Sequence, residues 1–217
     1  MQQTITIRTE QPNDYETVET LTRKAFWNLY VPGCHEHYLA HIIRNHEDFL
    51  PELDLVLELD GQIIGNIMYT KSRLVDPDGE EKTILTFGPV SIDPQYQRMG
   101  YGKQLMEASF QKAAELGFEA IVIFGSPDNY VSRGFKSCLK YHISLEDHTY
   151  PAAMLVKELK PDALDNKNWV YFQSPAFDFD PEDAEQFDAN LEHWEKKWQS
   201  SQESFYIISR SLLQNPE

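Results

Sequence analysis

The sequence has few of the features that mark several large classes of protein. Only two of its 217 residues are cysteines, Cys34 and Cys138, which is too few for a disulfide framework, and their spacing is not that of a metal site. It has no run of about 18 apolar residues, the length that a membrane-spanning helix needs. The first residues lack the basic and then apolar layout of a secretory signal. We therefore expect a cytoplasmic protein that does not enter a membrane.

Basic residues are also scarce, since 19 lysines and arginines stand against 35 aspartates and glutamates, giving a formal net charge of -16. Such a surface repels nucleic-acid phosphates, so we do not expect nucleic-acid binding. The acidity is uneven. Residues 89–140 carry six basic and five acidic side chains, whereas residues 161–217 carry twelve acidic and four basic ones. The central segment therefore suits an anionic ligand, and the remaining surface attracts a cationic one.

The chain does have 41% hydrophobic residues, enough for a sizeable core in one domain. No internal repeat or low-complexity tract divides it. We expect a domain over residues 1–160 and, from about Pro161, an acidic C-terminal extension over residues 161–217 that packs on this domain. The sequence leaves open whether the chain forms a homodimer.

Alternating apolar residues and helical periodicity predict a mixed α/β (α+β) fold. Asp60-Gly61 favours a hairpin, and Pro89 favours a bulge inside its strand. A helix from Gly100 leads to an apolar strand, which should be parallel to the strand before that helix. Helices are also expected after Pro12 and over about 36–45. The expected strands are 3–8, 53–59, 62–72, 82–92, 120–124 and a closing antiparallel pair at 141–145 and 153–159.

The C-terminal extension has patterns of its own. Residues 168–172 are consistent with a strand. Residues 181–198 form an acidic stretch with aromatic and apolar residues at helical spacing, which predicts one helix. Residues 205–212 resemble a strand because they combine aromatic and β-branched residues.

A glycine turn follows the strand that ends at Ile92. Gly100 and Gly102 have no Cβ, so a ligand can lie close to backbone N–H groups that the first helical turn leaves unpaired. The positive end of the helix dipole also favours an anion there. Arg98 and Lys103 either help to bind that anion or are solvated surface charges.

The stretch Gln97-Arg98-Met99-Gly100-Tyr101-Gly102 resembles the acyl-CoA signature of the GNAT superfamily of N-acyltransferases, Gln/Arg-x-x-Gly-x-Gly/Ala. The Val-x-Ile-Asp-Pro strand end before it, and the Tyr-x-x-x-Gly-Phe pattern from Tyr130 to Phe135, sit where the family has them. This resemblance implies a GNAT-type fold with a mostly antiparallel central sheet, one parallel pair of strands and helices on both faces. The bulge at Pro89 would separate neighbouring strands and admit the pantetheine arm of acetyl-CoA.

The resemblance also implies roles for individual residues. Tyr130 is the candidate general acid that protonates the leaving thiolate, although it could simply pack on the cofactor. Asn129 either reaches the cofactor or is a turn residue. Backbone groups of Val90, Ser91 and Ile92 would bind the pantetheine arm. Backbone N–H groups of the turn would bind the pyrophosphate, and the cofactor-binding residues expected there are Gln97, Arg98, Met99, Gly100, Tyr101, Gly102 and Lys103.

The general base is not identified by the sequence. Candidates are His35, Glu36 and His37, in the segment expected on the acceptor side. His37 and His41 have the spacing of a metal pair but no further ligand, so no metal is expected. Cys34 is not expected to act as a nucleophile, because direct transfer needs no acyl-enzyme.

These features predict an N-acetyltransferase that moves an acetyl group from acetyl-CoA directly to the primary amine of a small, cationic acceptor. The alternative is a CoA-binding sensor or interaction module without turnover.

Overall fold

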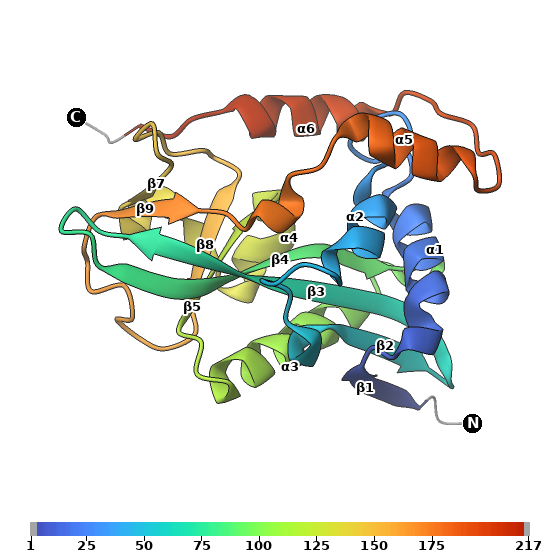
Figure 1. Cartoon of the computed structure of the whole chain (residues 1–217), viewed down its shortest axis with the longest axis horizontal. Helices are drawn as coiled ribbons and strands as arrows, with labels where there is room; N and C mark the ends of the chain where they lie inside the picture. Colours follow the sequence, from blue (N-terminus) through green and yellow to red (C-terminus); the bar gives the residue numbers. More distant parts are fainter. Residues whose placement is uncertain (1–3, 215–217) are drawn as a thin grey trace.

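A sheet runs through the centre of the protein and has helices on both faces (Figure 1). The computed structural model describes residues 4–214. The main path of this nine-stranded sheet follows the order β1-β2-β3-β4-β5-β8-β6, and β7 and β9 pair outside that path. The strands are β1 (Ile5–Thr9), β2 (Leu55–Leu59), β3 (Gln62–Val75), β4 (Glu81–Ile92), β5 (Ala120–Phe124), β6 (Lys136–Ser137), β7 (Ile143–Ser144), β8 (Met154–Glu158) and β9 (Trp169–Phe172).

The helices pack on the sheet through separate apolar clusters. Leu105 and Phe110 of α3 join the cluster formed with Leu57 and Leu85 of the sheet. Val18 of α1 and residues of α2 join another cluster, formed with Val56 and Met68. Because side chains alternate along a strand, neighbours such as Val56 and Leu57 serve opposite faces. The helices are α1 (Tyr15–Phe26), α2 (Glu36–Ile43), α3 (Tyr101–Glu115), α4 (Pro127–Tyr130), α5 (Pro181–Ala189) and α6 (Ser200–Arg210).

The predicted sheet is confirmed in its main features. Most neighbouring strands are antiparallel, whereas β4 and β5 are parallel and joined through α3. Asp60 and Gly61 both have positive φ values, 51° and 83°, and connect β2 to β3 as the predicted hairpin. The predicted bulge is also present, because Met68 alone stands opposite Gly88 and Pro89.

The predicted pairing of residues 141–145 with 153–159 is wrong. Both edges of β8 are already occupied, by β5 on one side and by β6 on the other. His142 adopts a left-handed conformation with φ 54°, and the chain then turns toward β9. There Ile143 pairs with Trp169 in a second, short parallel ladder that the sequence did not predict.

Two predictions for the C-terminal residues are also wrong. The helix expected over 181–198 ends at Ala189, and residues 205–212 lie largely in α6 rather than in a strand. The strand expected over 168–172 is confirmed as β9, which pairs with the end of β3. Within residues 4–214, every helix is too short or too polar to reach across a lipid bilayer.

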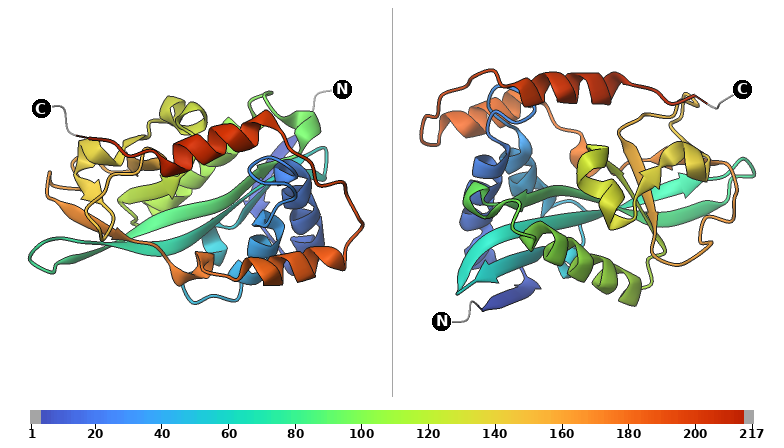
Figure 2. Two further views of the ribbon diagram at one scale, coloured as in Figure 1. Left: turned by 90° about the horizontal axis from the view of Figure 1, so that it is seen from above. Right: turned by 180° about the vertical axis from the view of Figure 1, so that it is seen from behind.

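Helix α6 crosses the top of the molecule, away from the sheet, and is fastened at both ends (Figure 2). Near its start, the Gln202 amide donates to the Asn28 carbonyl oxygen at 3.0 Å, and Phe205 stacks on Tyr30 with ring centroids 4.6 Å apart. Beyond its end, the Ala152 N–H donates to Ser211 O at 2.8 Å, and the Leu213 N–H donates to Tyr150 O at 2.8 Å. The helix therefore bridges the α1–α2 connection and the loop between β7 and β8.

Candidate active site

Strands β4 and β5 separate beyond their one paired position, Leu85 and Ile121. Past the bulge, Val90, Ser91 and Ile92 continue to pair with β3 on one side. On the other side no strand of the described chain pairs with them. An extended ligand with amide groups can add to such an edge as a further strand would. This is the geometry required of the three residues predicted to bind a pantetheine arm.

The glycine turn joins the end of β4 to α3 within a few residues. A short 3-10 helix (Pro94–Tyr96) follows β4, and the Gln97 amide donates to the Ile92 carbonyl oxygen at 3.0 Å. Arg98 and Gly100 then take positive φ values, 64° and 94°. The turn therefore folds back on the strand end, and its N–H groups are gathered at the start of α3.

These N–H groups have no partner in residues 4–214. No backbone N–H from Gln97 to Lys103 donates a hydrogen bond within that range. Unpaired N–H groups at a helix start form an anion site, because the helix dipole adds to their own polarity. A Cβ on Gly102 would lie 3.4 Å from Ile92 Cγ1, so a glycine also lets α3 start close to β4. The turn fits a pyrophosphate.

The remaining side chains predicted for the cofactor are mostly at the surface. Arg98 makes no ion pair within the described chain, and Lys103 lies 3.7 Å from Glu107. Met99 is 64% exposed, whereas the Tyr101 side chain is buried. Asn129 is exposed on α4 and its side chain has no hydrogen-bond partner in the described residues. The structure thus leaves Arg98 and Asn129 free to reach a ligand.

Tyr130 lies at the end of α4, close to the gap between β4 and β5. Its ring centroid is 5.8 Å from that of Phe87 in β4 and 5.8 Å from that of Phe135. Burial raises the pKa of its phenol, and Tyr30 raises it further. A phenol is protonated at neutral pH even at its ordinary pKa near 10, and this shift keeps it so, as a proton donor requires.

Sequence reasoning missed two residues around Tyr130. A Cβ on Gly125 would collide with the Tyr130 ring, so glycine is required where β5 ends and α4 begins. The Gly-Ser-Pro sequence that follows an apolar strand could have indicated this position. Tyr30 stacks on Phe205 of α6 and raises the pKa of Tyr130, and nothing in its local sequence indicates either relationship.

The three candidate bases have different surroundings. The His37 imidazole is fully buried, with Nδ1 3.3 Å from the Cys34 sulfur and Nε2 3.2 Å from Asp188 Oδ1. Burial lowers the pKa of His37 to about 4, although Asp188 opposes this effect. His35 lies edge-on to Phe179, with ring centroids 6.4 Å apart. Burial raises the pKa of Glu36.

His37 and His41 do not share a ligand position. His41 Nδ1 lies 3.1 Å from a Glu19 oxygen, on the exposed side of the helix. Residues 4–214 contain no group of three or more histidine, cysteine or acidic side chains that could hold a metal ion. Burial also raises the pKa of the Cys34 thiol, which makes it a poor nucleophile.

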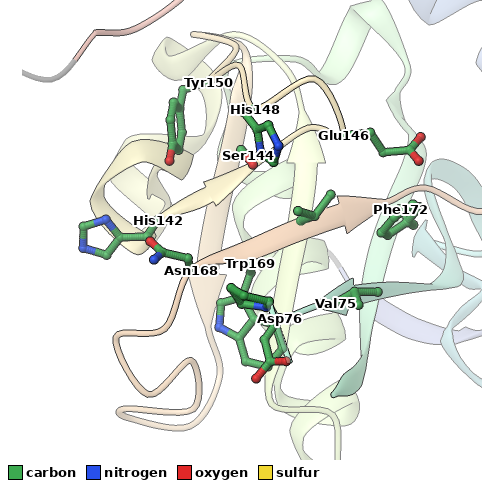
Figure 3. A pocket seen from close by; sticks show the side chains of 12 residues that line it. Val75, Asp76, His142, Ser144, Glu146, His148, Tyr150, Asn168, Trp169 and Phe172 are labelled. Atoms are coloured by element: carbon green, nitrogen blue, oxygen red, sulfur yellow. The ribbon is translucent and has the colours of Figure 1, made fainter. Parts of the chain in front are cut away.

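A cavity of about 510 Å³ lies elsewhere, beside the start of β4, whereas the glycine turn follows the end of that strand (Figure 3). Its lining comes from the end of β3 and the residues after it, from β9, from β7 and from the loop after β7. An open groove of about 650 Å³ lies nearer the turn, between the end of α1, Asp93–Gln95 and residues of the C-terminal segment. The cavity in Figure 3 does not include any residue predicted to bind cofactor.

Comparisons with known proteins agree with this geometry. A sequence profile described as "Acetyltransferase (GNAT) family" matches residues 21–137. The chain is 30% identical over 159 residues to the uncharacterized N-acetyltransferase YhbS of Escherichia coli K12, which covers 73% of this chain and 89% of that protein. It is 26% identical to another E. coli K12 protein, the uncharacterized N-acetyltransferase YjhQ, over 52% of this chain and 58% of that one.

Solved structures are similar as well. The E. coli YhbS structure in complex with CoA superposes with a TM-score of 0.67 at 26% identity, covering 81% of this chain and 92% of that chain. A GNAT family acetyltransferase from Brucella melitensis in complex with acetyl-CoA gives a TM-score of 0.62 at 24% identity, covering 81% of this chain and 99% of that one, which shows a shared fold. The profile match and the YhbS relationship establish that the chain belongs to the GNAT family of acetyltransferases.

Proposed function

We propose that the protein transfers an acetyl group from acetyl-CoA directly to the primary amine of a small, cationic acceptor. The observation that carries this proposal is the unpaired edge of β4 beside a turn whose N–H groups have no partner in the described chain. The unpaired edge of β4 suits the amide groups of a pantetheine arm, and the turn suits a pyrophosphate. Acetyl-CoA carries these two groups next to each other, as the edge and the turn are placed here. CoA and acetyl-CoA are the ligands in the two related structures.

Residues near this edge supply the chemistry of the transfer. The amine nitrogen attacks the thioester carbonyl carbon, a C–N bond forms, and the C–S bond breaks. The Tyr130 phenol donates its proton to the leaving sulfur and regains one from the nitrogen that has become an amide. A phenol is protonated at pH 7 and can donate its proton to the sulfur from this place beside Phe87.

The limit on acceptor size comes from α6. This helix is fastened to Asn28 and Tyr30 at one end and to Tyr150 and Ala152 at the other, so it covers the side of the molecule on which Tyr30 lies. An acceptor entrance beside this fixed helix would favour a small molecule over a folded protein. The acidic surface favours a cation.

Steady-state release of free CoA thiol tests the proposal. We expect turnover with at least one class of a panel that contains polyamines, aminoglycosides, amino acids and peptides with a free N-terminus, and higher kcat/KM for small cations than for peptides. Calorimetry with acetyl-CoA serves as the parallel measurement. Acetyl-CoA binding without turnover on any amine would favour a sensor or interaction module over an enzyme.

A further inference from the structure

Three aromatic side chains lie on the face of the sheet that is turned away from α3, at the point where β4 and β5 separate. They are Phe124, the last residue of β5, Tyr171 of β9, and Phe177 of the segment that leads from β9 to α5 (Figure 1). We propose that these three side chains, named here the aromatic wall, bind the carbon arm of the acceptor and select a primary amine whose arm is apolar. This inference rests on the proposed acetyl transfer and names the class of amine.

The aromatic wall contacts β4 at the two residues on either side of Phe87. The hydroxyl groups of Tyr171 and Thr86 are hydrogen-bonded to each other at 2.6 Å. A Cβ on Gly88 would lie 3.4 Å from Phe177 Cε1, so the Phe177 ring lies against this glycine. Because side chains alternate along a strand, the Phe87 ring points to the opposite face from Thr86. The wall therefore lies within one residue of Phe87, across the sheet from its ring.

Phe87 lies at the place where we expect the transfer. Its ring is 5.8 Å from that of Tyr130, the proposed acid, and both belong to the apolar cluster that packs against α3. The turn proposed to bind the pyrophosphate leads into α3, so acetyl-CoA approaches the gap between β4 and β5 from this face. An amine that attacks the same thioester needs room on the other face, because the cofactor occupies the first. The aromatic wall lies on that other face.

Phe124 is the member of the wall that is most open to a ligand. Strand β5 pairs with β4 at a single position, which comes before Phe124 along the strand. Phe124 is 43% exposed, and its ring centroid lies 5.9 Å from that of Tyr171. Gly88 is also partly exposed, whereas both of its neighbours in the sequence are buried. Solvent, and therefore a small ligand, has access to both residues.

The other two members of the wall are fixed by contacts within the described chain. Tyr171 is 3% exposed and is held by its hydroxyl group. The segment that carries Phe177 is attached through Ser174, whose N–H donates to Ser72 Oγ at 3.3 Å and whose hydroxyl donates to Asp48 Oδ2 at 2.6 Å. A surface that is already ordered loses little conformational entropy when a ligand binds, which favours affinity.

The chemistry of the wall favours an apolar arm. Its surface consists of aromatic rings, and its one hydroxyl, that of Tyr171, is already bonded to Thr86. A substrate hydroxyl placed here would lose its hydrogen bonds to water without replacement, which costs free energy. A hydrocarbon arm gains free energy by leaving water, and an ammonium group is attracted to the face of an aromatic ring. The wall therefore suits an arylalkylamine or alkylamine better than a sugar amine.

A Phe124→Ala variant tests the wall with three amines. Phenethylamine has an apolar arm, ethanolamine is a small amine with a hydroxyl group, and kanamycin is an aminoglycoside. In the wild type we expect kcat/KM for phenethylamine to be about ten-fold or more above that for the other two. In the variant, kcat/KM for phenethylamine should fall about ten-fold, mostly through KM, as expected for one lost apolar contact in a pocket. For ethanolamine it should change by less than about two-fold, because this amine has no arm that reaches the ring.

Two further variants separate the contact from a general defect. Phe124→Leu keeps most of the apolar surface and should restore kcat/KM for phenethylamine to within about three-fold of the wild type. Leu116→Ala removes an apolar side chain of similar exposure at the end of α3 and is the matched control, which should behave as the wild type. The dissociation constant of acetyl-CoA, measured by calorimetry, should not change in any of the three variants.

The outcomes distinguish this inference from the proposed function. Equal losses with phenethylamine and ethanolamine, an unchanged KM for phenethylamine, or weaker binding of acetyl-CoA in Phe124→Ala would each overturn the assignment of the wall. A wild type that acetylates kanamycin better than phenethylamine would overturn the inference and leave the proposed function standing. A wild type that binds acetyl-CoA but acetylates no amine would instead refute the proposed function itself.

Discussion

The Tyr130 hydroxyl is the group whose removal separates chemistry from binding. A Tyr130→Phe change leaves the ring against Phe87 and Phe135 and removes only the proton donor. We expect kcat to fall about 100-fold, because general acid catalysis contributes that much or more. The dissociation constant of acetyl-CoA should change by less than about two-fold. Steady-state thiol release and calorimetry measure the two quantities.

Tyr141→Phe is a suitable control, since Tyr141 packs on a different apolar cluster and lies outside the proposed site. An unchanged kcat in Tyr130→Phe would remove Tyr130 from the acid role. A large loss of acetyl-CoA affinity would instead show that the hydroxyl serves binding.

At the residue scale, sequence reasoning worked where a role depends on local backbone. Asp60-Gly61 favours a hairpin, and both residues have the positive φ that this turn requires, so the residue types alone predict it. The glycines of the turn before α3 were predicted for the close approach of a ligand, whereas the positive φ of Gly100 was found only in the structure. Tyr30 could not be assigned in this way. It stacks on Phe205 of α6, a segment far along the chain, and no local pattern reports that contact.

At the scale of elements, α5 is anchored to α1 and α2 by a small buried polar cluster. Asp188 contacts both Arg23 and His37, at 2.8 and 3.2 Å. The residues after α5 continue this attachment. Arg23 donates to Glu192 O at 2.8 Å, and the Trp27 indole donates to Glu195 O at 3.0 Å.

This attachment explains why the helix predicted over 181–198 stops at Ala189. Carbonyl oxygens that would accept bonds within a longer helix accept them from side chains of α1 and the residues after it. Asn28 also accepts from the Lys197 N–H at 3.0 Å. A helical pattern in the sequence cannot show that competing donors exist 165 or more residues earlier in the chain. For α6 the sequence predicted a strand and the structure has a helix. The segment is rich in residues that favour strands, but Gln202 and Phe205, which are three residues apart and so lie on one side of the helix, contact Asn28 and Tyr30.

The buried cluster of Asp188, Arg23 and His37 leads to a prediction about how the stability of the protein depends on pH. His37 has a pKa of about 4 in the folded protein, below its ordinary value near 6.5, so the unfolded chain binds this proton more readily. The free energy of unfolding should therefore fall as the pH drops below about 6.5, and this loss should be complete below about pH 4. The expected size is about 3 kcal/mol. Urea unfolding at pH 7, 6, 5 and 4 measures it.

The comparison should be made with a His37→Gln variant. Other groups titrate in the same range, notably Asp54, whose pKa burial raises to about 9 and whose effect has the opposite sign. Subtracting the free energy of unfolding of the variant from that of the wild type at each pH removes these contributions. His193→Gln, a change at an exposed histidine of the same C-terminal segment, should follow the wild type. Parallel curves for wild type and His37→Gln would contradict the prediction.

At the scale of the whole molecule, the charge distribution suits the two substrates of opposite sign that we propose. The formal net charge is -16, yet residues 89–140, which include the glycine turn, hold one more basic than acidic side chain. The C-terminal segment, which is strongly acidic, runs beside α2 and then across the molecule as α6, and we place the acceptor on this side (Figure 2). The field should therefore draw a cationic amine toward that side, while the turn remains open to an anion.

This arrangement predicts the effect of salt on each substrate. Between about 10 mM and 100 mM ionic strength the screening length falls from about 30 Å to about 10 Å, so attraction from distant carboxylates is lost. We expect kcat/KM for a cationic amine to fall about three- to ten-fold over this range, whereas a neutral amine of the same size should change by less than two-fold. The dissociation constant of acetyl-CoA, set by N–H groups at short range, should vary much less. Equal salt dependence for both amines would mean that the acidity of this protein does not contribute to capturing its acceptor.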